Sequence, residues 1–129
     1  MKRLLFLFIS LILVVALLAG CSRGVKYYVN PEESINTKVN HEFIIAKSFN
    51  PNSIYMWREY YDEDILDLVE NTIGVGEQNK QNNNEVALAQ HFRFKALKKG
   101  NTEITLIYSR LTLEGPRIGK EEVFNVNIE

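Results

Sequence analysis

The side chains that could act as nucleophiles or metal ligands are few and widely spaced in this chain. Cys21 is the single cysteine, and the two histidines, His41 and His91, are far apart in the sequence. The sequence contains no His-x-x-x-His pair, no Gly-x-Ser-x-Gly turn and no phosphate-binding glycine motif. These observations predict a protein that is not an enzyme and that holds no metal or other cofactor.

Four acidic residues near the middle of the chain are the remaining candidates for a cation site: Glu59, Asp62, Glu63 and Asp64. Their spacing does not match an EF-hand loop, which places oxygen ligands on alternate residues around a central glycine. We expect a solvated turn here, with a cation site as the alternative.

The surroundings of Cys21 suggest a different chemistry, acylation of its thiol. Lys2 and Arg3 precede an apolar run from Leu4 to Leu18, which is the layout of an export signal. The last four residues, Leu18-Ala19-Gly20-Cys21, resemble the lipobox of bacterial lipoproteins. A transmembrane helix is the alternative, but the run is shorter than the roughly 20 residues that span a bilayer.

The lipobox resemblance implies a division of the chain into three parts. Residues 1–20 are expected to be a signal peptide, residues 21–34 the lipidated Cys21 and a tether, and residues 35–129 a folded domain. It also implies a lipid anchor in a membrane of the cell envelope, with the domain on the extracytoplasmic side. A lipidated Cys21 would leave no thiol for a disulfide or a metal site.

Charge and composition exclude one further class of partner. The chain has 15 Lys and Arg against 16 Asp and Glu, and it has no block of basic residues. A basic patch is the usual mark of a nucleic-acid-binding protein, so we expect no nucleic-acid partner. The length of the chain after Cys21 suits a single domain, which we expect to be a monomer.

The elements that would position any site are predicted to be strands. Phe92-Arg93-Phe94-Lys95-Ala96 alternates with a period of two, as in a strand with one buried face. Shorter apolar or β-branched runs lie at 43–46, 54–61, 65–69, 104–108 and 123–128, with turns between them. About seven strands without a helical period predict an all-β protein, a β-sandwich. Residues 25–29 fit either tether or a first strand, and we slightly favour a tether that runs into a strand.

Three smaller features complete the expected layout. Gly74 to Glu85 contains a run of Gln and Asn without an apolar anchor, which predicts a mobile loop. Gly115-Pro116 and Gly119 are expected to lie in the loop before the last strand. His91 continues the alternation of the strand at Phe92, so its side chain is expected to face solvent or a loop end.

The segment Asn50-Pro51-Asn52-Ser53-Ile54-Tyr55-Met56-Trp57 resembles the first binding loop of chagasin-type inhibitors, which reads Asn-Pro-Thr-Thr-Gly-Tyr-x-Trp. Residues 90–96, 100–104 and 106–110 follow the order and spacing of the same family. The resemblance covers roughly residues 39–129. It implies an immunoglobulin-like sandwich in which three loops at one end enter the cleft of a papain-like cysteine peptidase.

The same resemblance implies which residues would contact the peptidase. They are Asn50, Pro51, Asn52, Ser53, Ile54 and Tyr55 in the first loop and Arg110, Leu111 and Thr112 in the third. The second loop would be Glu85–Leu88 or, with a shifted alignment, Gly74–Gly76. The chain departs from the family pattern where Ile54 replaces a glycine and where Leu111-Thr112 replaces Pro-Trp.

Two interpretations of the retained residues stay open. Trp57 is expected to be a buried core tryptophan of the sandwich, with a contact residue as the alternative. The leading function is a lipid-anchored inhibitor of papain-like cysteine peptidases. The alternative is a non-inhibitory surface binding module of the cell envelope with the same fold.

Overall fold

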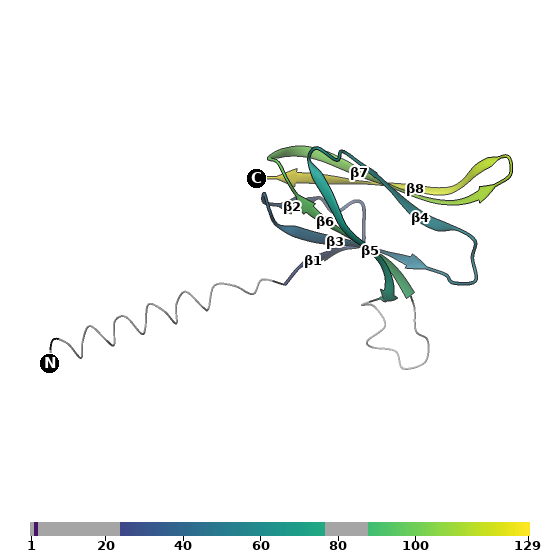
Figure 1. The fold of residues 1–129 in the computed structure, drawn as a ribbon, viewed down its shortest axis with the longest axis horizontal. Coiled ribbons are helices and arrows are strands. Elements are labelled where there is room, and N and C mark those ends of the chain that lie inside the picture. Colours follow the sequence, from purple (N-terminus) through teal and green to yellow (C-terminus); the bar gives the residue numbers. More distant parts are fainter. Residues whose placement is uncertain (1, 3–23, 77–87) are drawn as a thin grey trace.

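The computed structural model describes residues 2, 24–76 and 88–129 (Figure 1). These residues form eight strands, whose bounds are β1 Lys26–Tyr28, β2 Ile35–Thr37, β3 Glu42–Phe49, β4 Met56–Tyr61, β5 Leu66–Val75, β6 Leu88–Ala96, β7 Gly100–Thr112 and β8 Gly115–Ile128. The segment expected to be a signal peptide (apart from Lys2), Cys21 and most of the Gln/Asn-rich segment (77–87) lie outside the described residues. Within the part of the chain that is described, no helix is long and apolar enough to cross a bilayer.

The strands form two four-stranded sheets that face each other. One sheet has the order β1-β3-β6-β5 and the other the order β2-β8-β7-β4. All neighbours are antiparallel except β1 with β3 and β2 with β8, which are parallel. The protein is therefore all-β, an immunoglobulin-like β-sandwich as expected, with eight described strands where the sequence suggested about seven.

The core lies between the sheets and follows from the alternation along each strand. Phe92 and Phe94 of β6 are fully buried, and Ile104 and Leu106 of β7 meet them from the other sheet. The same cluster includes Phe124 of β8. Burying one such side chain stabilises the fold by about 1.5–3 kcal/mol relative to leaving it exposed.

The sandwich begins earlier than residue 35, where we expected the domain to start. Tyr28 of β1 is 2% exposed and contacts the ring of Phe43 edge-on, with 6.2 Å between ring centroids. The pairing of Tyr28 with Ile45 in the adjacent strand places β1 firmly in the first sheet. The strand expected at 25–29 is therefore present as Lys26–Tyr28, inside the segment 21–34 that was expected to serve as tether.

The β7–β8 hairpin is longer than expected, and the prediction of a loop at Gly115–Gly119 was wrong. Thr112 pairs with Gly115, so Leu113 and Glu114 alone form the turn. Gly115 has a φ of 114°, a backbone conformation that favours glycine. Pro116 is tolerated inside β8 because Leu111 and Pro116 follow the hydrogen-bonded pair that closes the turn, so the nitrogen of Pro116 points away from β7. On the other side, β2 pairs with β8 only from Val126 onward.

Candidate functional site

One end of the sandwich carries the β3–β4 loop, residues 50–55, and the tip of the β7–β8 hairpin (Figure 1). Both project at the end away from the point where the chain enters β1. Phe49 pairs with Leu88, and Leu88 pairs with Val75, so β3 and β5 finish and β6 begins at this same end. The fold therefore brings the first and third predicted loops to one place.

The β3–β4 loop is held in shape by its own polar groups. The N–H of Ser53 donates to the carbonyl oxygen of Asn50 (3.0 Å), and the N–H of Asn52 donates to Asn50 Oδ1 (3.0 Å). The N–H of Tyr55 then donates to Ser53 Oγ (3.1 Å). Pro51, in the second position of the turn, fixes φ in the range that such a turn needs.

Ile54 fits this loop without backbone strain. Among the described residues, Asn40 is the one non-glycine residue with a positive φ. Ile54 therefore does not adopt the left-handed backbone conformation that favours glycine. Its side chain is 69% exposed at the tip. The replacement of the family glycine thus adds an exposed aliphatic side chain and does not strain the backbone.

Tyr55 fastens the loop to the β7–β8 hairpin. Its ring stacks on Tyr108, with centroids 5.2 Å apart, and the guanidinium carbon of Arg110 lies 5.6 Å from the Tyr55 centroid. The ring also lies over Gly119, where a Cβ would come within 3.2 Å of Tyr55 Cε1. Tyr55 is therefore half-buried, and its main contacts are within the domain.

The third predicted contact segment lies in β7, and its residues face opposite sides of the hairpin. Arg110 points toward Tyr55, whereas Leu111 lies with Tyr60 and Ile118 on the outer face of the second sheet, as alternation along a strand requires. Thr112 Oγ1 donates to the carbonyl oxygen of Gly115 and closes the turn. A ligand approaching the loop end would therefore meet Arg110 and Leu111 from different directions.

Trp57 lies beneath the loops, and the interpretation of a core tryptophan is confirmed. It is 6% exposed and packs on Tyr108 with 5.1 Å between centroids. Its indole N–H donates to the carbonyl oxygen of Ser48 (3.1 Å) in the other sheet. Its backbone N–H donates to Gln90 Oε1 (3.2 Å), and Gln90 Nε2 donates back to the Trp57 carbonyl oxygen (3.0 Å). Trp57 thus links the two sheets directly behind the loops.

A buried ion pair behind Trp57 was missed by the sequence analysis. Lys47 of β3 and Glu122 of β8 are both inward-facing and pair across the sandwich. Lys47 Nζ also donates to the carbonyl oxygen of Val29 (3.1 Å) and lies 5.2 Å from the Trp57 ring centroid. Burial raises the pKa of the Glu122 carboxyl, but hydrogen bonds from Lys120 and Lys47 outweigh burial and hold that pKa below its usual value of 4.5.

The remaining polar candidates are placed as follows. His91 was expected to face solvent or a loop end. It is half-buried: the Tyr27 ring meets it edge-on with 6.0 Å between centroids, and Gly74 lies beside it. The acidic residues 62–64 form the β4–β5 turn, in which the N–H of Asp64 donates to Asp62 Oδ1 (3.0 Å).

The second predicted loop is described only at its edges. Residues 85–87 lie outside the described residues, whereas Leu88 is the first residue of β6. The alternative location, Gly74–Gly76, is largely strand, because Gly74 and Val75 belong to β5. Two of the three residues at the alternative location, 74–76, therefore belong to a paired strand and not to a loop.

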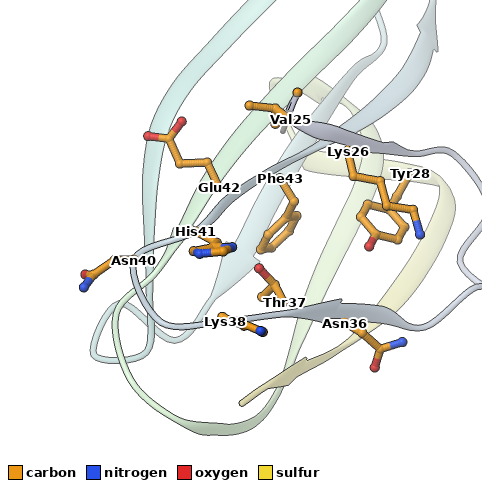
Figure 2. A pocket seen from close by; sticks show the side chains of 11 residues that line it. Val25, Lys26, Tyr28, Asn36, Thr37, Lys38, Asn40, His41, Glu42 and Phe43 are labelled. Carbon is orange, nitrogen blue, oxygen red and sulfur yellow. The ribbon is translucent and has the colours of Figure 1, made fainter. Parts of the chain in front are cut away.

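A hollow of about 660 Å³ lies at the other end of the sandwich, between the edge strands β1 and β2 (Figure 2). Figure 2 shows Phe43 between Lys26 of β1 and Thr37 of β2. The two strands belong to different sheets and are not paired with each other. This hollow is therefore far from the loops and is lined by neither of them.

Comparison with known proteins agrees with this arrangement. Residues 36–128 match the family described as "Chagasin family peptidase inhibitor I42". The chain therefore belongs to the chagasin family of peptidase inhibitors, which are not enzymes. A comparison with curated protein sequences gave no significant match.

Two solved structures share the fold. One is the crystal structure of the cysteine protease inhibitor EhICP2 from Entamoeba histolytica, with 24% identity and a TM-score of 0.60, covering 84% of this chain and 100% of that one. The other is the solution structure of amebosin, with 19% identity and a TM-score of 0.58, covering 83% of this chain and 100% of that one. At these identities the structural similarity shows that the three proteins share a fold, the β-sandwich.

Proposed function

We propose that this protein is a lipid-anchored inhibitor of papain-like cysteine peptidases that blocks the active-site cleft with the loop end of its sandwich. The observation that carries the proposal is the docking of Tyr55 between Tyr108 and Arg110, which ties the β3–β4 loop to the β7–β8 hairpin. Family membership and the cysteine protease inhibitor with the same fold support the choice of partner.

The construction of the loop end suits inhibition without cleavage. The internal hydrogen bonds of residues 50–55 fix the loop before it binds, so little conformational entropy is lost on association. The exposed side chains at the tips include two aliphatic ones, Ile54 in the loop and Leu113 in the hairpin turn. These two side chains would enter the cleft, while the residues beneath them keep the tips rigid.

The lipid anchor would lie at the opposite end of the domain. The chain enters β1 at Lys26, away from the loops (Figure 1), and five extended residues reach about 18 Å at most. A lipid on Cys21 would therefore hold the domain close to the membrane, with its loops pointing away from it. Replacement of Cys21 by serine should abolish lipid labelling and release the protein from membranes; normal processing and membrane fractionation of this variant would contradict the anchor.

Inhibition can be tested with the domain alone, because all eight strands lie within residues 24–129. The domain would be titrated against papain, with residual activity read from a fluorogenic peptide. We expect inhibition by the wild type and at least a tenfold weaker Ki for Ile54→Asp, since hot-spot side chains usually contribute about 2 kcal/mol. Val69→Asp changes an exposed side chain of β5; it is the matched control and should inhibit like the wild type.

The non-inhibitory binding module is favoured by one observation. The segment that carries the third contact in the family is here a paired strand without an aromatic residue, Arg110-Leu111-Thr112. If the wild-type domain leaves papain and several related peptidases active at high micromolar concentration, the inhibitor proposal is wrong and this alternative stands.

A further inference from the structure

The outer face of the second sheet carries an apolar patch that the proposed inhibition does not use. The exposed members of this face patch are Leu111 (75% exposed), Ile118 (61%), Tyr60 (58%), Met56 (41%) and Val123 (36%). Exposed apolar side chains gathered on one face of a soluble protein often mark an interaction site. A hollow of about 190 Å³ opens in the patch over Ser109, which is small and nearly buried between larger neighbours.

The register of β4, β7 and β8 places these residues in rows across the sheet. Ile107 of β7 stands in the central row, paired with Arg58 of β4 on one side and with Glu121 of β8 on the other. Toward the loop end, Met56 and Ile118 flank Ser109 in the same way. In the other direction, Tyr60 and Val123 flank Thr105.

The charged residues of the central row have no ion-pair partner within 24–76 and 88–129. The four ion pairs recorded there involve neither Arg58 nor Glu121. The two side chains are separated by a whole strand, β7, so they are poorly placed to reach each other within one domain. One positive and one negative group thus stand on opposite flanks of an apolar face.

We propose that this face is a dimer interface with a second copy of the same chain. A two-fold axis parallel to β7 lays β4 of each copy over β8 of the other, while β7 faces β7. Arg58 of one copy then meets Glu121 of its partner, twice. In the neighbouring rows Met56 meets Ile118 and Tyr60 meets Val123, so charge and apolar surface are matched in these three rows.

The direction of the axis follows from the charges. A two-fold axis across the strands would instead lay β4 over β4 and β8 over β8, which opposes like charges in the central row.

With the axis along β7, both loop ends point the same way and both chain entries lie at the opposite end. Two copies anchored in one membrane could associate in this arrangement; that consequence rests on the proposed anchor, but the dimer does not. The expectation of a monomer is replaced by this proposal.

The test is sedimentation equilibrium of residues 24–129 between about 1 µM and 1 mM, a range that covers the affinities of weak to moderate interfaces. We expect a concentration-dependent monomer–dimer equilibrium. Arg58→Glu and Glu121→Arg should each weaken the dimer by roughly 100-fold, because like charges then face each other across the interface. The double exchange should restore the wild-type Kd to within about threefold, because it rebuilds both pairs with their signs reversed.

Two further variants separate the face from general effects. Ile107→Glu places two carboxylates near the axis and should give a folded monomer, as judged by circular dichroism. Ile73→Glu, at an exposed aliphatic position of β5 that lies outside the face patch, should leave the equilibrium unchanged. A wild type that stays monomeric to about 1 mM refutes the proposal, as does a dimer that is insensitive to Arg58→Glu or not restored by the exchange. The monomeric variants should still inhibit papain, so the two proposals can fail separately.

Discussion

Replacing Glu122 by glutamine would leave the Lys47 ammonium buried without its anion. The side chains of Lys47 and Glu122 are only 10% and 8% exposed, so solvent cannot take over the role of the lost carboxylate. Removing one partner of a buried pair typically costs about 3–5 kcal/mol. The carbonyl oxygen of Val29 and the rings of Trp57 and Phe124 still attract the ammonium, which places the expected cost near the lower end, about 3 kcal/mol.

A loss of this size is easily measured in a domain of this length. At about 4–8 °C per kcal/mol, Tm should fall by roughly 12–24 °C in calorimetry at pH 7. The matched control is Lys47→Met with Glu122→Leu, which removes both charges and keeps the volume. It should be within about 1 kcal/mol of the wild type or more stable, because the desolvation cost of both ions disappears.

The pH dependence gives an independent check on the same pair. The folded pKa of Glu122 is lowered, so the carboxylate contributes stability that is fully present above about 4.5 and is lost as pH falls through the folded pKa. The difference between wild type and Glu122→Gln should therefore shrink in urea titrations below pH 4.5. A single variant that costs less than about 1 kcal/mol at pH 7, or a double variant as unstable as the single, would refute this reasoning.

Three further outcomes are expected. Trp57→Ala should destabilise the domain by about 3–5 kcal/mol in urea unfolding, because it opens a cavity and leaves the carbonyl oxygen of Ser48 without its donor; an unchanged midpoint would contradict the core role. Gly119→Val should displace the Tyr55 ring and weaken inhibition of papain more than it lowers Tm, whereas equal losses in Gly119→Val and Gly115→Val would point to hairpin strain alone. Tyr55→Phe, which keeps the ring stacked on Tyr108, should inhibit like the wild type, and Tyr55→Ala should not.

Local patterns in the sequence predicted most of the fold. The alternation at Phe92–Ala96 gave the buried and exposed faces of β6, because the period of two survives in any sandwich strand. The hairpin was misjudged since Gly115-Pro116 and Gly119 resemble loop residues. Gly115 fits the tight turn, and Gly119 lies next to the register shift between β7 and β8, so both are compatible with continuous pairing.

The site was predicted less well than the fold, for a physical reason. Residues 50–55 were found because they are contiguous, whereas the partners that position them come from distant strands. In the sequence, Lys47 and Glu122 each stand at the end of a short apolar run. Only the packing of one sheet on the other shows that both side chains point inward. The same holds for Arg110, whose direction depends on its place in β7.

The bonds between Gln90 and Trp57 also bear on aggregation. β4 is an edge strand, and the backbone N–H and carbonyl of Trp57 that bond Gln90 would otherwise be open to a strand from another molecule. The amide side chain occupies both groups as a neighbouring strand would, and it also donates to Asn71 Oδ1 (3.1 Å) of β5, the edge strand of the other sheet. A single buried glutamine thus bridges two edge strands and removes one pair of backbone groups with which a foreign strand could pair.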